Sequence, residues 1–142
     1  MVETPAAAIM TPVLAKYVDF FSIGTNDLVQ YTLAVDRGNA NISYLYNHFN
    51  PAVLRLVQRT ISSARENGIW AGMCGEMASD PNAAVLLMAM GISELSMSAP
   101  SIPRVKEKIR SISSVKAKEI LADVMAMEDG DEIRNYLQKI LG

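Results

Sequence analysis

The chain alternates between short apolar runs of strand length and longer segments in which apolar residues recur at helical spacing. Strands are predicted over residues 18–24, 69–76 and 92–99, and Met1 and Val2 have the character of the last residues of a further strand. Apolar strands that alternate with helices are typical of a parallel sheet covered by helices. The predicted fold class is therefore α/β with about four βα units. Four units make half of a (β/α)8 barrel or a small open sheet, and pattern alone leaves both possible.

Start and stop signals delimit the helices. Residues 50–68 and 80–91 each begin with Asn or Asp followed by proline and end at glycine, which are good capping residues. A helix that opens at Pro5 contains Pro12, where we expect a kink or a late start because proline removes a backbone hydrogen bond.

Three more helices are expected after the last predicted strand. The first is a basic helix over residues 104–112, and Asp131 is a plausible N-cap for the third. The apolar faces of the second and third comprise Ala117, Ile120, Leu121 and Val124, then Ile133, Tyr136, Leu137, Ile140 and Leu141. We interpret residues 1–142 as one partial barrel domain, with a half-barrel over 1–112 and C-terminal helices over 113–142.

Composition narrows the function classes. Of the 142 residues 50% are hydrophobic and 20% charged, which is enough apolar material for a sizeable core. The net charge of -2 gives no electrostatic basis for binding nucleic acid or anionic membranes, and no apolar run approaches the roughly 18 residues of a membrane span. The single cysteine excludes an internal disulfide, and no signal peptide is evident, so a cytoplasmic protein is expected. Because the chain opens on the end of a strand, we expect it to be the tail of something longer.

Reactive residues stand where the predicted strands end. Glu3 follows the first strand, the sequence GTND (24–27) follows the second, and GMCGE (72–76) ends the third. Ligands bind at the carboxyl ends of parallel strands, so these residues are expected to meet. Glu3 and Asp27 would suit Mg²⁺, which takes one or two carboxylates and completes its shell with water and substrate oxygens. The alternative is that Asp27 caps a helix starting at Leu28 and that Glu3 is solvated.

Three further residues each allow two interpretations. Cys74 is either a small buried residue of the strand or, because Gly72 and Gly75 stand near it, a reactive thiol. Arg37 either binds a phosphate or carboxylate, or has a structural role as a surface arginine or as the partner of Asp36, which its spacing alone favours. His48, the only histidine, is more simply an ordinary loop residue than a phosphate carrier, because no acidic residue stands near it in the sequence.

The longer motifs carry a resemblance. MVETPAAA, VDFFSIGTNDLVQYTLAVDRGN, NPAVL, GMCGE and SMSAPSIPRVK, spread over residues 1 to about 125, closely resemble the C-terminal part of enzyme I of the bacterial sugar phosphotransferase system, the phosphoenolpyruvate–protein phosphotransferase family. Pyruvate phosphate dikinase and phosphoenolpyruvate (PEP) synthase share the strand-end glutamate and the GTNDL and CGE loops. The segments YTLAVDRGN and GMCGEMASD are more similar to the phosphotransferase branch.

The resemblance implies a (β/α)8 barrel that binds PEP and Mg²⁺, with this chain as its second half. It implies that Glu3 and Asp27 are metal ligands, and that Asn26, Asp27 and Arg37 bind PEP. It implies that Cys74 protonates the methylene carbon of the pyruvate enolate. The implied partners are an N-terminal domain with the phosphate-accepting histidine, the carrier protein HPr and a second copy in a homodimer. That histidine's motif and two further phosphate-binding arginines of the family are absent here, so the chain alone is expected not to complete the reaction.

Two other hypotheses compete with this one. The chain could be a non-catalytic half-barrel that serves as a dimerisation or interaction module, and selective binding of Mg²⁺ would distinguish the two. A dikinase-type enzyme is disfavoured by the residues around Arg37 and Cys74.

Overall fold

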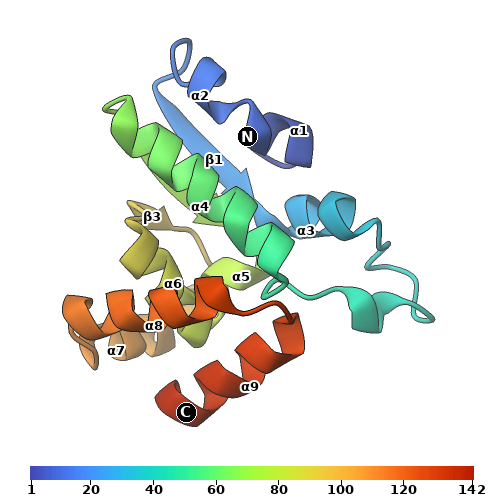
Figure 1. Cartoon of the computed structure of the whole chain (residues 1–142), viewed down its shortest axis with the longest axis vertical. Coiled ribbons are helices and arrows are strands. Elements are labelled where there is room, and N and C mark those ends of the chain that lie inside the picture. Colours follow the sequence, from blue (N-terminus) through green and yellow to red (C-terminus); the bar gives the residue numbers. More distant parts are fainter.

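The computed structural model describes all 142 residues and confirms the α/β class (Figure 1). Three parallel strands, β1 (Phe20–Gly24), β2 (Trp70–Cys74) and β3 (Glu94–Leu95), form one sheet in that order. Val2 adds one parallel bridge to Ile23 on the other side of β1. The four-unit half-barrel stays a prediction, because the sheet itself has three strands.

The predicted strand over residues 92–99 is wrong in its length, since β3 has only two residues. Hydrogen bonds continue the pairing by one residue on each side, from the Ser93 N–H to the Ala71 carbonyl and from the Ser96 N–H to the Met73 carbonyl. On its outer side, however, β3 has no neighbouring strand. Its partner β2 ends at Cys74, so residues 97–99 have no strand beside them with which to pair.

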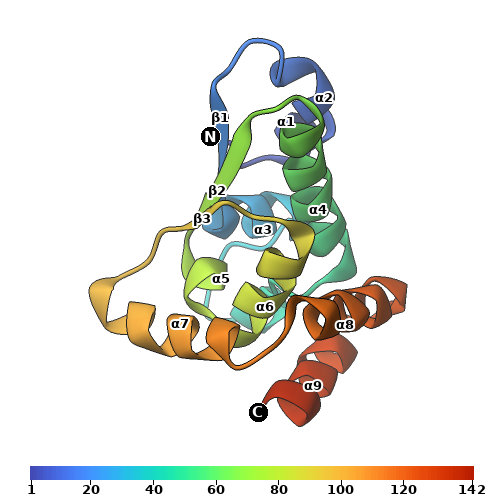
Figure 2. The same cartoon turned by 90° about the vertical axis from the view of Figure 1, so that its left-hand side faces the viewer.

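Helices cover only one face of the sheet (Figure 2). Phe21 and Ile23 of β1, with Ala71 and Met73 of β2, point to that face and are all buried. The opposite face carries Phe20 and Trp70, which are paired in the β1–β2 register and stack with ring centroids 4.3 Å apart. We call the face with Phe20, Ser22, Trp70, Cys74 and Glu94 the open face.

The open face is unusual for a parallel sheet, because such sheets are normally covered on both sides. Phe20 remains 47% exposed and Trp70 41% exposed although the two rings stack. Their exposure shows that no layer covers these two rings on the open face.

The helices form one continuous core beneath the sheet. They are α1 (Pro5–Ile9), α2 (Thr11–Leu14), α3 (Thr25–Leu33), α4 (Pro51–Glu66), α5 (Glu76–Ser79), α6 (Pro81–Met90), α7 (Ile102–Arg110), α8 (Ser114–Ala126) and α9 (Gly130–Leu141), with short 3₁₀ turns η1 (Ser43–Leu45) and η2 (Ala99–Ser101). α4 packs on β1 and β2, and α6 lies against both α7 and α8. α6 buries residues on all sides, as expected for a helix surrounded by other elements.

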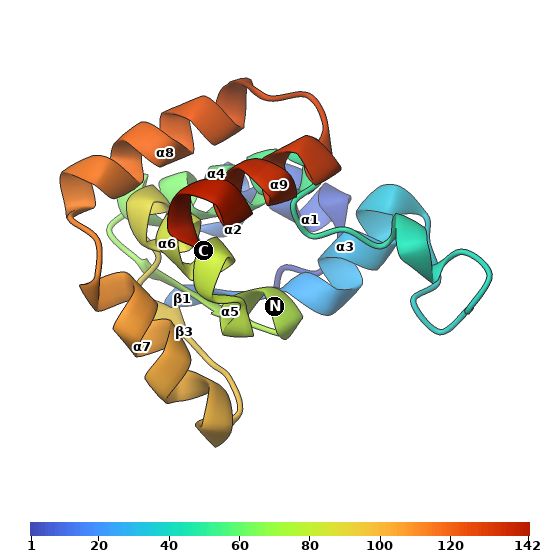
Figure 3. The ribbon, with the colours of Figure 1, turned by 90° about the horizontal axis from the view of Figure 1, so that it is seen from below.

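The C-terminal helices α8 and α9 share that core (Figure 3). Their buried side chains belong to the same hydrophobic cluster as the sheet: Ile120, Leu121, Val124, Ile133 and Leu137. The division between residues 1–112 and 113–142 stays a prediction.

Most predicted helix boundaries are confirmed. Asn50 caps α4 through the Ala52 N–H, and Asp80 caps α6, which ends at Gly91 in the left-handed conformation (φ 93°). The helix opened by Pro5 is interrupted before Pro12, and α1 and α2 are separate helices.

The predicted N-cap of the last helix is wrong. Asp129 rather than Asp131 caps α9, because its carboxylate accepts the N–H groups of Asp131 and Glu132. Gly130 can hold the first helical position because its missing side chain leaves room for Asn47, whose amide nitrogen lies 2.7 Å from where a Cβ would stand. Two aspartates flank this glycine, and only packing selects between them.

No helix combines the length and the apolar character that crossing a membrane requires.

Asp80 supplies a test of how the core helix α6 is held. Its Oδ1 accepts the N–H groups of Asn82 and Ala83, and its Oδ2 lies 3.3 Å from His48 Nε2. Burial opposes ionisation of this carboxyl, but the hydrogen bonds from His48 and from the Ala83 and Asn82 backbone outweigh it and lower the pKa of Asp80.

We expect Asp80→Ala to lower the free energy of unfolding by about 1–2 kcal/mol at pH 7, the usual effect of losing an N-cap. Because the pKa is lowered on folding, the charged form's contribution is present above the unfolded pKa, about 3.9, and is lost as pH falls through the folded value. Asp80→Asn keeps a capping oxygen but has no charge to lose. Chemical denaturation between pH 7 and pH 2 should therefore show a smaller acid-dependent loss for Asp80→Asn than for the unsubstituted chain. Equal acid dependence of the two would contradict this account.

Candidate active site

The helix α3 begins directly where β1 ends, with no loop between them. Gly24 is the last residue of the strand and the N-cap of the helix, and Thr25 is the first helical residue. Asn26 and Asp27 therefore stand in the first helical turn, where a carboxylate is favoured by the helix dipole. The alternative that Asp27 caps a helix starting at Leu28 is wrong, because α3 starts three residues earlier.

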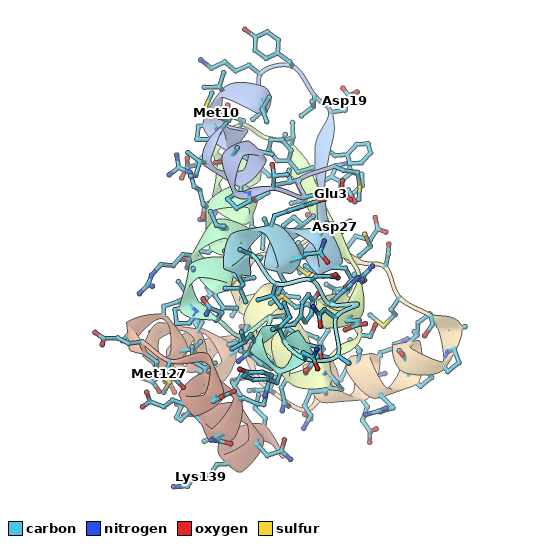
Figure 4. The ribbon with its side chains drawn as sticks, turned by 90° about the vertical axis from the view of Figure 1, so that its right-hand side faces the viewer. Glu3, Met10, Asp19, Asp27, Met127 and Lys139 are labelled. Carbon is cyan, nitrogen blue, oxygen red and sulfur yellow. The ribbon has the colours of Figure 1, made fainter.

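Glu3 lies against the same strand end. The Gly24 N–H donates to the Val2 carbonyl at 3.1 Å, which sets the chain before Glu3 alongside β1. A Cβ atom at Gly24 would lie 2.6 Å from Glu3 Oε1, so only glycine leaves room for this carboxylate. Figure 4 shows Glu3 and Asp27 at one end of β1, with Asp19 at its other end. Both acidic residues are partly buried.

Two hydrogen bonds join the end of β1 to the end of β2. Thr25 Oγ1 donates to the Cys74 carbonyl at 2.8 Å, and the Glu76 N–H donates to Asn26 Oδ1 at 3.0 Å. Gly75 lies between these bonds with φ 100°, and a Cβ there would stand 2.5 Å from Thr25 Oγ1. We call Thr25, Asn26, Cys74, Gly75 and Glu76 the strand-end junction.

The strand-end junction fixes how Asn26 presents its amide. Because Oδ1 accepts the Glu76 N–H, the side-chain oxygen faces the protein. The NH₂ group has no partner within the protein and is left to donate to a ligand.

Cys74 stands at the carboxyl end of β2 with its side chain on the open face. It pairs with Gly24 in the sheet register, so no side chain from β1 covers it. Its thiol is partly exposed and donates a long hydrogen bond to the Ile23 carbonyl, with an Sγ–O distance of 3.8 Å. Cys74 is thus partly rather than fully buried, and both interpretations of it stay open.

Arg37 lies in an exposed loop between α3 and α4 and forms no ion pair. The predicted alternative, a pair with Asp36, is wrong: Asp36 Oδ1 instead accepts the Gly38 N–H at 2.8 Å. Arg37 lines a polar cavity of about 400 Å³ that Glu76 of the strand-end junction also lines. Arginine and junction thus share one cavity.

Tyr46 is a site residue that sequence reasoning missed. Its hydroxyl donates to the Asn26 carbonyl at 3.2 Å, and its ring lines the same cavity as Arg37. Burial raises the pKa of Tyr46, the nearby carboxylates of Glu76 and Asp27 raise it further, and Arg37 opposes them. The phenol therefore stays protonated and acts as a donor. It stands 20 residues from its partner with no spacing signal, and only the folded chain brings the two together.

His48 contacts Asp80, an acidic partner 32 residues away in the sequence. It lines a second polar cavity of about 540 Å³ with Glu76, Arg104 and Lys108. The contact ties the loop to the start of α6, in keeping with an ordinary structural role for this histidine.

The donor set limits which metal the site could hold. No group of three or more His, Cys, Asp or Glu side chains is arranged to hold an ion. Glu3 and Asp27 offer two carboxylates and no nitrogen or sulfur. Such a set fits Mg²⁺, whose remaining ligands would be water and substrate oxygens, and it does not fit a closed zinc site.

Comparison with known proteins matches residues 1–114 to the family described as PEP-utilising enzyme, PEP-binding domain. Among similar proteins, a phosphoenolpyruvate-protein phosphotransferase of Buchnera aphidicola is 52% identical over 99% of this chain and 25% of its own length. Phosphotransferases of the same name from Haemophilus influenzae and Lactococcus lactis are each 50% identical, over 99% and 91% of the chain and 24% and 23% of their own lengths.

The chain thus spans about a quarter of the length of the curated relatives it matches. The family match includes all of the strand-end junction together with Glu3 and Arg37. With strand-end carboxylates, an oriented amide and a thiol at one end of a parallel sheet, the chain belongs to the PEP-binding domain family of the PEP-utilising enzymes.

Proposed function

We propose that this chain is the part of a phosphoenolpyruvate–protein phosphotransferase that binds PEP and Mg²⁺. The observation that carries the proposal is the strand-end junction, which holds Asn26 and Cys74 in one hydrogen-bonded unit next to Glu3 and Asp27. The similar proteins that match nearly the whole chain bear this name, which favours it over a dikinase.

The phosphate of PEP would be held by Asn26 and Arg37. The Asn26 NH₂ group is oriented as a donor by the bond between its Oδ1 and the Glu76 N–H. The Arg37 guanidinium is free of protein carboxylates and suits bidentate binding of phosphate oxygens.

Glu3 and Asp27 would hold Mg²⁺ between the strand ends. Bound there, the ion supplies positive charge that stabilises the developing enolate oxygen. The two residues themselves fix where that charge stands, because Gly24 allows the Glu3 carboxylate to lie directly on β1 and α3 fixes Asp27.

Cys74 would supply the proton that completes pyruvate. When the phosphoryl group leaves PEP, the P–O bond breaks and its electron pair forms the enolate of pyruvate. The Cys74 thiol then transfers its proton to the methylene carbon, which becomes a methyl group, and a thiolate remains. The Cys74 Sγ lies 3.8 Å from the Ile23 carbonyl, an acceptor toward which a thiol can donate.

The phosphoryl acceptor would lie outside this chain. By the family resemblance it is a histidine on an N-terminal domain, which passes the group to HPr in the cytoplasm. His48 is a poor candidate, because the residues around it do not match the family's phosphate-accepting motif.

The open face supports a half-barrel. In a (β/α)8 barrel the inner face of each strand is covered by side chains of the other strands. Phe20 and Trp70 lie on the face without helices, as inner-face residues of such a barrel would. We propose that the remaining strands of a longer protein cover them, and that the complete protein forms a homodimer.

A non-catalytic interaction module is the second candidate, since the open face could serve assembly alone. This candidate does not explain why the Asn26 amide is oriented by the Glu76 N–H or why the Glu3 carboxylate lies against Gly24.

Calorimetric titration of PEP into the complete phosphotransferase that carries this segment tests the proposal. We expect binding that depends on Mg²⁺ and that Asp27→Asn weakens by at least about tenfold, the effect of losing even a group that only supports a metal ligand. Asp19→Asn is the matched control, because Asp19 stands at the opposite end of β1 (Figure 4). Equal binding with and without Mg²⁺, or equal loss in both variants, would contradict it.

Replacement of the thiol tests the chemistry separately. Cys74→Ala should lower pyruvate formation by about 10²–10⁴-fold, the usual contribution of a positioned acid. Its affinity for PEP should stay unchanged, because Cys74 contributes only its backbone carbonyl to the strand-end junction. Pyruvate release and PEP binding would be measured on the same preparation, and normal turnover would remove Cys74 from the mechanism.

Trp70, the only tryptophan, reports on the open face. Acrylamide should quench its fluorescence readily in this chain alone, where it is 41% exposed, and much less in the complete protein. Similar quenching in both would show that no other part of the protein covers this face.

A further inference from the structure

Tyr46 stands at the end of the loop that carries Arg37. Residues 36–45 of this loop contribute no buried side chain to the protein. Within this range only Ile42 is partly buried, and the Tyr46 ring that follows packs against the core. Packing therefore holds residues 36–45 weakly, and their hydrogen bonds contribute strongly to their position.

Those hydrogen bonds are almost all internal to the loop. Asp36, Asn39, Ala40 and Ile42 accept the bonds that form its successive turns and η1. At its start, the Arg37 N–H reaches Gln30 Oε1 of α3 through a long contact of 3.4 Å. From Gly38 to Tyr46, the one hydrogen bond to another part of the protein is from the Tyr46 hydroxyl to the Asn26 carbonyl.

We propose that Tyr46 is a positioning residue of the substrate site, whose hydroxyl holds the Arg37 loop against the first turn of α3 so that Arg37 and the Asn26 amide bind one phosphate. This inference rests on the proposed function. Tyr46 acts through Arg37 and Asn26 and does not itself touch the reacting atoms.

The cavity geometry agrees with this role. The 400 Å³ cavity is lined by Arg37, Gly38 and Ser43 of the loop together with Tyr46 and Glu76. Asn26 is hydrogen-bonded to two of the residues that line the cavity. Its carbonyl accepts the Tyr46 hydroxyl, and its Oδ1 accepts the Glu76 N–H. One hydroxyl therefore links the loop to the residue whose amide would donate to the same phosphate.

Tyr46→Phe removes the hydroxyl and keeps the ring, and Tyr44→Phe is the matched control. Tyr44 lies in the same loop, is 78% exposed and makes no side-chain hydrogen bond. In the complete phosphotransferase we expect Tyr46→Phe to raise KM for PEP about three- to tenfold, as the loss of one hydrogen bond would, with kcat unchanged. Oxalate, which resembles the enolate end of PEP but lacks phosphate, should bind with Mg²⁺ as before. Tyr44→Phe should change neither.

A double substitution tests whether Tyr46 acts through Arg37. Tyr46→Phe should cause no further loss of PEP affinity in an Arg37→Ala background, because the positioned group is already gone. Hydrogen exchange gives a readout without substrate: amides of residues 38–45 should exchange faster in Tyr46→Phe and not in Tyr44→Phe.

Three results would overturn the inference: an unchanged KM in Tyr46→Phe, additive losses in the double variant, or an equal loss of oxalate affinity, which would indicate general damage to the site. Failure of the proposed function would show differently, as no PEP binding by the unsubstituted enzyme, and both proposals would then fall.

Discussion

The candidate site depends on the close approach of two strand ends. Thr25 and Glu76 each donate one hydrogen bond across the junction between β1 and β2, and Gly75 is the residue that lets the two chains come this near. A side chain at that position would collide with Thr25 and would force a left-handed backbone on a residue that disfavours it. The orientation of the Asn26 amide and the position of Glu76 beside the Arg37 cavity follow from this contact.

Sequence patterns predicted correctly those features that depend on residues close together in the chain. Proline after a capping residue located α4 and α6, and strand-end polar residues located Asn26 and Cys74. They failed for features that depend on contacts between residues far apart in the sequence. β3 is shorter than predicted because its partner β2 ends at Cys74, and the cap of α9 is Asp129, next to a Gly130 that packs against Asn47. The site residue Tyr46 had no local signal at all, since its only distant partner is a backbone carbonyl, which every residue possesses.

The geometry excluded two of the structural alternatives that the sequence left open. Asp36 and Asp27 were both candidates for common structural roles, an ion pair and a helix cap. Asp36 instead caps a turn, and Asp27 lies within the first turn of α3, so Arg37 is left without a carboxylate partner and Asp27 remains available to a ligand. A carboxylate and a guanidinium that serve no internal contact are the groups that a charged substrate would use.

The stacked rings of Phe20 and Trp70 lie at the amino-terminal ends of the same strands whose carboxyl ends carry the junction. Each strand is five residues long, and in the proposed function its first residue would serve assembly while its last would stand at the ligand site. The two roles are thus separated along the strand by fewer than twenty ångströms of backbone. Evolution could therefore alter the bulk of the aromatic end to suit a different covering layer without disturbing the chemistry, and could change the ligand at the other end on an unchanged scaffold.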